Sequence, residues 1–183
     1  MFLRVASIVL LTALTLPVGA QDHKISQLAK EGHWLPEKWE QHAPLLGKQA
    51  PKLDLSDWIN GELSKEDMEG KIVIVDFWAT WCGPCINAIP HNNEMVANYK
   101  DKGVLLVGIC GSGRGEEKMA SVVKDKGITY PVAHPTADTT KAWGVAYWPT
   151  YAVVDRNGIV RALGIKPDYV DKIVDALLLE QPK

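Results

Sequence analysis

Two apolar runs stand out near the middle of the chain. Residues 72–79 (IVIVDFWA) are apolar on both faces apart from Asp76, and residues 104–110 (VLLVGIC) repeat the pattern. A strand covered on both sides shows such a continuous run, so we predict two central strands. Residues 85–100 follow the first run and are predicted as a helix that Pro90 interrupts.

The C-terminal part predicts a helix, a hairpin and a final helix. Residues 116–125 have helical spacing, and residues 150–154 and 159–163 are strand-like runs joined by a turn at 155–158. Residues 167–179 are amphipathic and open with proline and aspartate, as helix N-termini often do. A βαβ unit followed by a ββα unit predicts an α/β fold, with a mixed sheet and helices on both faces.

Before residue 72, the pattern of hydrophobic and polar residues is less regular. Residues 52–58 are predicted as a strand that turns at residues 60–61 and returns through residues 62–63. Ser64 then opens a short helix, with Asp67 three residues on in a capping-box arrangement. No internal repeat is visible, and 183 residues fit one domain with an extension.

The first twenty residues have the composition of a secretory signal peptide. Residues 1–4 are a basic start, residues 5–16 an apolar run, and Pro17 precedes the small-residue segment 18–20. The apolar run is short for a membrane span, which needs about 20 residues. We therefore predict cleavage after Ala20 and a periplasmic or secreted protein without stable membrane insertion. The alternative is an uncleaved membrane anchor.

Residues 21–44 are interpreted as an N-terminal extension of a main domain at 45–183. The extension holds Trp34, Trp39 and three of the five histidines, and residues 37–42 predict a short helix after a proline. The two tryptophans either form a partner-docking arm or pack onto their own domain. The histidines are scattered in sequence and suggest no metal site.

Composition and charge narrow the classes of function. The chain is 46% hydrophobic and 23% charged, and its formal net charge of −2 indicates no polybasic surface for nucleic acid or anionic lipid. A chain this long does not need disulfides to stay folded, so Cys82 and Cys85 point to chemistry. Cys110 ends a predicted strand and is expected in the core. Residues 111–115 are glycine-rich but lack the lysine of a phosphate-binding loop.

Cys82 and Cys85 lie where the first central strand gives way to a helix. A zinc site needs a second cysteine pair, and a c-type haem site needs histidine where Ile86 stands. A structural disulfide closing so small a ring would add little stability. At a helix N-terminus, free N–H groups and the helix dipole favour a thiolate on Cys82, and Cys85 can then resolve a mixed disulfide.

The segment VDFWATWCGPC (residues 75–85) closely resembles the active-site segment of thioredoxins. Pro90 matches their helix proline, and residues 148–150 match their cis-proline loop. Residues 47–51 and 154–158 are similar to the exported TlpA/ResA-type thiol–disulfide oxidoreductases of this superfamily. The resemblance covers roughly residues 45–183 and implies a thioredoxin fold.

The resemblance also implies roles for individual residues. Cys82, at the exposed helix N-terminus, would attack the substrate disulfide, and Cys85, more buried, would resolve the mixed disulfide. Asp76 would exchange a proton with Cys85. Thioredoxin's lysine partner of this aspartate has no evident match here, and Trp148 stands where thioredoxins carry an aliphatic residue. A cis peptide at Pro149 would expose the Trp148 backbone to a substrate strand. The residues expected to contact substrate are Trp81, Gly83, Pro84, Trp148, Pro149 and Thr150.

The expected function is an exported enzyme that reduces disulfides in proteins, apocytochrome c among the candidates. The Gly-Pro spacer favours the reducing end of the potential scale. The expected partners are disulfide-bearing proteins and a membrane-bound electron donor, with no cofactor, metal or nucleic acid, and a monomer is expected. Three alternatives are a disulfide oxidant, a non-catalytic binding module and a redoxin-type thiol peroxidase. The peroxidase needs a Pro-x-x-x-Thr-x-x-Cys frame, and Val75 and Ala79 stand at its proline and threonine positions.

Overall fold

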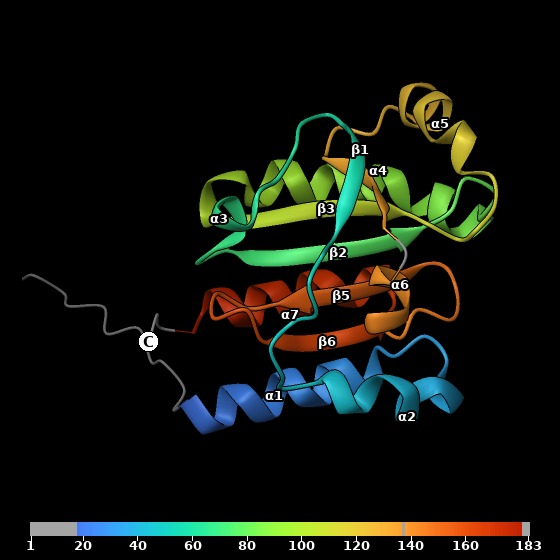
Figure 1. Cartoon of the computed structure of the whole chain (residues 1–183). Coiled ribbons are helices and arrows are strands. Elements are labelled where there is room, and N and C mark those ends of the chain that lie inside the picture. The colour runs from blue at the N-terminus through green and yellow to red at the C-terminus, as the bar shows by residue number, and fades with distance from the viewer. Residues whose placement is uncertain (1–17, 137, 181–183) are drawn as a thin grey trace, which may run out of the picture.

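The computed structural model describes residues 18–136 and 138–180, so residues 1–17 of the predicted signal peptide lie outside the described residues. A six-stranded mixed sheet in the order β1-β4-β3-β2-β5-β6 runs through the molecule, with helices packed around it (Figure 1). Its strands are β1 (Leu55–Ile59), β2 (Ile72–Trp78), β3 (Val104–Cys110), β4 (Val132–Pro135), β5 (Thr150–Val154) and β6 (Val160–Ile165). The predicted α/β class with a mixed sheet is confirmed.

Strand β2 lies at the centre, as its sequence predicts. Every residue of β2 is buried, and it pairs in parallel with β3 and antiparallel with β5. Val73 and Val75 face one core cluster together with Trp143, while Ile74 faces the other. A strand with both faces covered can keep a continuous apolar run, because neither face meets water.

The helices of the described residues complete the layers. They are α1 (Val18–Glu31), α2 (Trp39–His42), α3 (Lys65–Met68), α4 (Gly83–Tyr99), α5 (Met119–Lys126), α6 (Thr139–Ala142) and α7 (Pro167–Leu178). The long helices α4 and α7 share the core cluster that holds Ile74, Met95 and Ile173. The predicted hairpin β5–β6 and the final helix are confirmed. Strand β4 and helix α6 were not anticipated from the sequence.

The expected hairpin at residues 52–63 is wrong. Strand β1 pairs antiparallel with β4 instead, and residues 62–63 form no strand. The side chain of Asn60 donates to the carbonyl oxygens of Ile128 and Tyr130, at 2.7 and 3.2 Å, and so ties the end of β1 to the segment leading into β4. The predicted capping box of Ser64 and Asp67 is present at the start of α3.

Helix α4 is continuous rather than interrupted at Pro90, and it begins at Gly83. Pro90 is exposed, whereas its neighbours Ile89 and Asn92 are buried against the sheet. Packing of this buried face holds the turns on both sides of the proline together, which outweighs the missing backbone hydrogen bond. No helix of the described residues is both long and apolar enough to span a membrane.

The N-terminal extension packs closely on the rest of the protein. Helix α1 lies along α7 and β6 at the edge of the sheet (Figure 1), where Ile25 and Ala29 are buried. Trp34 and Trp39 are half-buried, which agrees with packing onto their own domain. Arg161 of β6 binds Asp22 of α1, so charged contacts also join the extension to the sheet.

The extension brings together two histidines that are scattered in sequence. His33 and His42 are buried, with 2.9 Å between His33 Nε2 and His42 Nδ1, and His42 Nε2 lies 3.1 Å from the Gly144 carbonyl oxygen. This oxygen can only accept, so His42 donates from Nε2 and receives a hydrogen bond from His33. Gly164 of β6 passes directly against the pair, and a Cβ atom there would lie 2.2 Å from His42 Nδ1.

Candidate active site at the disulfide

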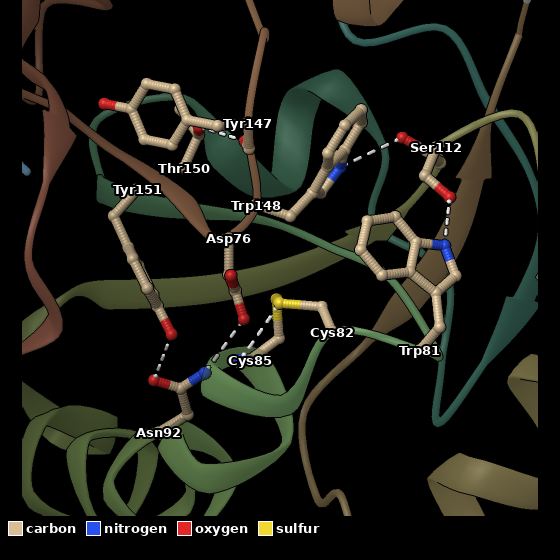
Figure 2. The surroundings of a disulfide bond; sticks show 11 residues. Asp76, Trp81, Cys82, Cys85, Asn92, Ser112, Tyr147, Trp148, Thr150 and Tyr151 are labelled. Carbon is tan, nitrogen blue, oxygen red and sulfur yellow. Dashed lines mark hydrogen bonds between the residues drawn. A yellow bond between two sulfur atoms is a disulfide. The ribbon is translucent and has the colours of Figure 1, made fainter. Parts of the chain in front are cut away.

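Cys82 and Cys85 form a disulfide at the N-terminus of α4 (Figure 2). Cys82 is the N-cap residue of this helix, and the backbone N–H of Cys85 donates to its sulfur at 3.2 Å. Such a donor, together with the helix dipole, stabilises negative charge on the Cys82 sulfur once the disulfide opens. The geometry therefore favours Cys82 as the thiolate of the pair.

The expected difference in burial between the two cysteines is absent. Each is only 2% exposed, although the sequence predicts an exposed Cys82 and a more buried Cys85. Trp148 packs against the core cluster that contains both cysteines, and its segment arrives from a distant part of the chain. By contrast, Trp81, which directly precedes Cys82, is 47% exposed.

Asp76 of β2 is buried behind the disulfide, and its carboxyl group points toward it in Figure 2. Its Oδ2 accepts a hydrogen bond of 2.9 Å from Asn92 Nδ2, while its Oδ1 has no hydrogen-bond partner among the described residues. Burial raises the pKa of Asp76 to about 7, against the opposing effect of the hydrogen bond from Asn92. A carboxyl group with this pKa can take up and release a proton near neutrality.

Three neighbours of Asp76 were not anticipated from the sequence: Asn92, Tyr130 and Tyr151. Asn92 Nδ2 also donates to the Tyr130 hydroxyl at 3.1 Å, and the Tyr151 hydroxyl donates to Asn92 Oδ1 at 3.0 Å. Tyr151 stands opposite Asp76 in the β2–β5 register, and Asn92 lies two helical turns beyond Cys85 on the same face of α4. The missing lysine partner is thus replaced by a neutral amide, which leaves the Asp76 pKa high.

The segment before β5 forms the other wall of the site. The Trp148–Pro149 peptide is cis, as predicted, and Pro149 and Thr150 are buried. The Trp148 indole donates to the Gly111 carbonyl oxygen at 3.2 Å and meets the Trp81 ring edge-on, with 5.9 Å between the ring centroids. Trp148 and Trp81 therefore lie side by side at the disulfide (Figure 2).

The remaining predicted site residues differ in their exposure. Gly83 and Pro84, between the cysteines, are exposed and accessible to a substrate. Cys110 is a free thiol, 1% exposed, at the end of β3, and burial raises its pKa to about 12. A thiol with such a pKa is protonated and unreactive near neutrality, in line with its expected place in the core. Residues 18–136 and 138–180 contain no group of side chains arranged to hold a metal ion.

Comparisons with known proteins agree with this geometry. The model of the AhpC/TSA family matches residues 46–163. The thiol-disulfide oxidoreductase ResA of Bacillus thuringiensis is 32% identical over 116 residues, which are 63% of this chain and 66% of that relative. ResA of Geobacillus thermodenitrificans is 32% identical over 125 residues, or 68% of this chain and 71% of the relative. The chain thus spans just under two thirds of the first of these relatives.

Comparison with solved structures also finds thiol–disulfide oxidoreductases among the similar proteins. A putative thiol:disulfide interchange protein DsbE from Chlorobium tepidum is 31% identical, with a TM-score of 0.64 over 73% of this chain and 97% of that chain. The thioredoxin domain of a Bacteroides vulgatus oxidoreductase has the same TM-score at 23% identity, which shows the shared fold. The expected thioredoxin fold and the resemblance to ResA-type proteins are confirmed.

Proposed function

The chain belongs to the AhpC/TSA family, and we propose that it is an exported thiol–disulfide oxidoreductase that reduces disulfides of extracytoplasmic proteins. The observation that carries this proposal is the Cys82–Cys85 disulfide at the N-terminus of α4, with the titratable Asp76 behind it. The names of its relatives support the reaction. The signal-like residues 1–20 support export.

The first step is attack on the substrate disulfide. The Cys82 thiolate, stabilised by the Cys85 N–H and the helix dipole, bonds to one substrate sulfur and breaks the substrate's S–S bond. The other substrate sulfur leaves as a thiolate and takes a proton from water. The product is a mixed disulfide between Cys82 and the substrate.

The second step releases the substrate. The Cys85 thiol gives its proton to the Asp76 carboxylate, and the resulting thiolate attacks the Cys82 sulfur. This re-forms the Cys82–Cys85 disulfide and expels the second substrate thiolate, which is then protonated. The substrate has gained two electrons and the protein has lost two. A dithiol donor at the membrane must return them before the next cycle.

The substrates expected from this site are extended segments rather than compact proteins. Trp148 overhangs the disulfide beside Trp81, which narrows the approach. An unfolded apocytochrome c, with its Cys-x-x-Cys-His segment, has the required form and belongs to this proposed class.

The reduction potential of the Cys82–Cys85 couple tests the proposal most directly. We expect a potential closer to that of thioredoxin, about −270 mV, than to that of DsbA, about −120 mV. Cys85→Ser should trap a mixed disulfide with a cystine peptide, and Cys82→Ser should trap none. A potential near the DsbA value would favour the disulfide oxidant instead, and trapping at neither cysteine would favour a binding module.

A peroxide assay separates the thiol peroxidase alternative. The chain has no proline or threonine at the frame positions taken by Val75 and Ala79. We therefore expect reduced protein to react with a cystine peptide much faster than with hydrogen peroxide. Faster consumption of peroxide would refute the proposed reaction.

A further inference from the structure

The loop between β3 and α5 forms a wall beside Trp81. The Thr80 hydroxyl donates to the Gly115 carbonyl oxygen at 2.7 Å, and the Trp81 indole donates to Ser112 Oγ at 3.0 Å (Figure 2). Gly115 has a φ of +77°, and a Cβ atom there would lie 2.7 Å from Thr80 Oγ1. The loop is thus held directly against the residues that precede Cys82.

Internal hydrogen bonds hold the loop in this shape. The Glu116 carboxylate accepts from the backbone N–H groups of Ser112 and Gly113, at 2.6 and 2.7 Å. Burial acts to raise the pKa of Glu116, but these N–H groups outweigh it and keep the pKa below its usual value. The charge of Glu116 is therefore already engaged by the loop's own backbone.

The side chain of Arg114, at the tip of this loop, lies over an aromatic ring but forms no ion pair with the described residues. Its guanidinium carbon lies 4.3 Å from the centroid of the Trp81 ring. Within residues 18–136 and 138–180 its side chain makes no ion pair. Lys118, also unpaired there, and Glu117 share with Arg114 an open hollow of about 450 Å³ against Trp81. The lining side chains carry two positive charges and one negative charge.

We propose that Arg114, with Lys118, forms a subsite that binds the carboxylate of an acidic residue next to the disulfide of an extended substrate. This inference rests on the proposed function, because the subsite acts on the substrate of the Cys82–Cys85 pair. It identifies that substrate by its chemistry as a segment with an acidic residue beside the reacting cysteine.

Stacking prepares the guanidinium for this role. The guanidinium carbon lies over the Trp81 ring, and none of the hydrogen bonds among the described residues uses the Arg114 side chain as donor. Its N–H groups can therefore bind a carboxylate in bidentate fashion. A side chain already held on a ring also loses less conformational freedom on binding. A lysine in place of Arg114 would keep the charge but lose the flat fork of donors.

The position fits a residue close to the substrate cysteine. Trp81 directly precedes Cys82, and neighbouring Cα atoms in a chain are about 3.8 Å apart. An extended substrate advances about 3.3 Å per residue. A substrate cysteine bonded to Cys82 would therefore bring the residues within about two positions of it to the Trp81–Arg114 stack.

Matched cystine peptides test the subsite. They carry Glu or Gln at one position, either before or after the cysteine, and are otherwise identical. We expect kcat/KM to be about twofold to fivefold higher for Glu than for Gln on at least one side, as an ion pair at an exposed site provides. The preference should shrink as the salt concentration rises.

The variants are chosen to show that the preference comes from Arg114. Arg114→Gln should bring the Glu/Gln ratio close to one, and Arg114→Lys should leave part of it. Arg156→Gln is the matched control, since Arg156 follows β5 at the end of the sheet opposite Thr150 and Phe77. This control should keep the wild-type ratio.

Equal kcat/KM for both peptides in the wild-type protein, on both sides of the cysteine, would overturn the subsite. A protein that reduces neither peptide would instead refute the proposed function. The subsite is then decided by binding alone, measured by titration calorimetry on the protein with Cys82 and Cys85 both replaced by serine. Tighter binding of a Glu peptide than of its Gln counterpart supports it, and equal binding overturns it.

Discussion

Asp76→Asn is predicted to make the stability of the protein less sensitive to pH. Burial raises the pKa of Asp76 from 3.8 to about 7, so between these pH values the folded protein holds a proton that the unfolded chain has released. The free energy of unfolding therefore falls as the pH rises through this window. Below pH 3.8 the contribution of Asp76 is fully present, and above about pH 7 the loss is complete.

The size of the change in unfolding free energy follows from the shift in the Asp76 pKa. The difference, 7 − 3.8, is 3.2 pH units. At 1.36 kcal/mol per unit this amounts to about 4 kcal/mol of unfolding free energy lost across the window. Asparagine does not titrate, and its amide oxygen can still accept the hydrogen bond from Asn92. The variant should therefore lack the pH-dependent loss while keeping most of the local contacts.

Urea unfolding of the oxidised proteins at a series of pH values from 4 to 8 measures this effect. The unfolding free energy of Asp76→Asn minus that of the wild type should rise by about 4 kcal/mol from pH 4 to pH 8. Asp67→Asn is the control. Hydrogen bonds from Ser64 lower the pKa of Asp67, so its contribution is present above pH 3.8 and is lost only below it. Its difference should stay flat from pH 4 to 8.

A flat difference for Asp76→Asn over the same range would refute the reasoning. It would mean that Asp76 is already ionised in the folded protein at pH 4. The carboxyl group would then have no raised pKa, and the argument for Asp76 as the proton acceptor of Cys85 would fail with it.

Four further outcomes are expected. Asp76→Asn should slow resolution more than initial attack, so that stopped-flow measurements show the mixed disulfide accumulating; unchanged kinetics would leave Asp76 a purely structural role. Trp148→Ile should raise kcat/KM for insulin relative to an extended cystine peptide, and a change by the same factor for both would exclude Trp148 from specificity. Gly164→Ala, at a φ of +74° and against His42, should lower the urea-unfolding free energy by about 2–4 kcal/mol. Gly158→Ala, at a φ of +76° but against the flexible end of Gln49, should cost clearly less, and equal losses would contradict the clash. N-terminal sequencing of the exported protein should begin at Gln21, and retention of Met1 would favour the membrane anchor.

Much of the fold was predictable from patterns among residues that are close together in the sequence. The run of β2, the hairpin β5–β6 and the capping box at Ser64 each depend on residues close in sequence, and each was predictable. The partner of β1 was not, because it depends on Asn60 reaching the carbonyl oxygens of Ile128 and Tyr130. A polar residue after a strand does not reveal such a contact.

The functional site likewise contains residues that the sequence reveals and residues that only the fold brings together. Its cysteines and Asp76 stand in one short segment, and sequence alone was enough to find them. Asn92 and Tyr151 were missed because their contact with Asp76 needs the face of α4 and the register of β5. The only local signal was an asparagine two turns after Cys85 in an otherwise apolar helix face. The burial of Cys82 was also missed, because its core cluster draws in side chains from distant parts of the chain, Trp148 among them, more than sixty residues away.

That burial has a consequence for how the protein keeps its oxidation state. A thiolate must approach a disulfide sulfur along the S–S axis, and here each cysteine is only 2% exposed. In the oxidised protein, little of either cysteine is open to small thiols in the surrounding solution. We therefore expect small thiols to open this disulfide slowly. Reduction of the disulfide is then expected to depend on a partner that can dock beside Trp81 and Trp148 and open the site.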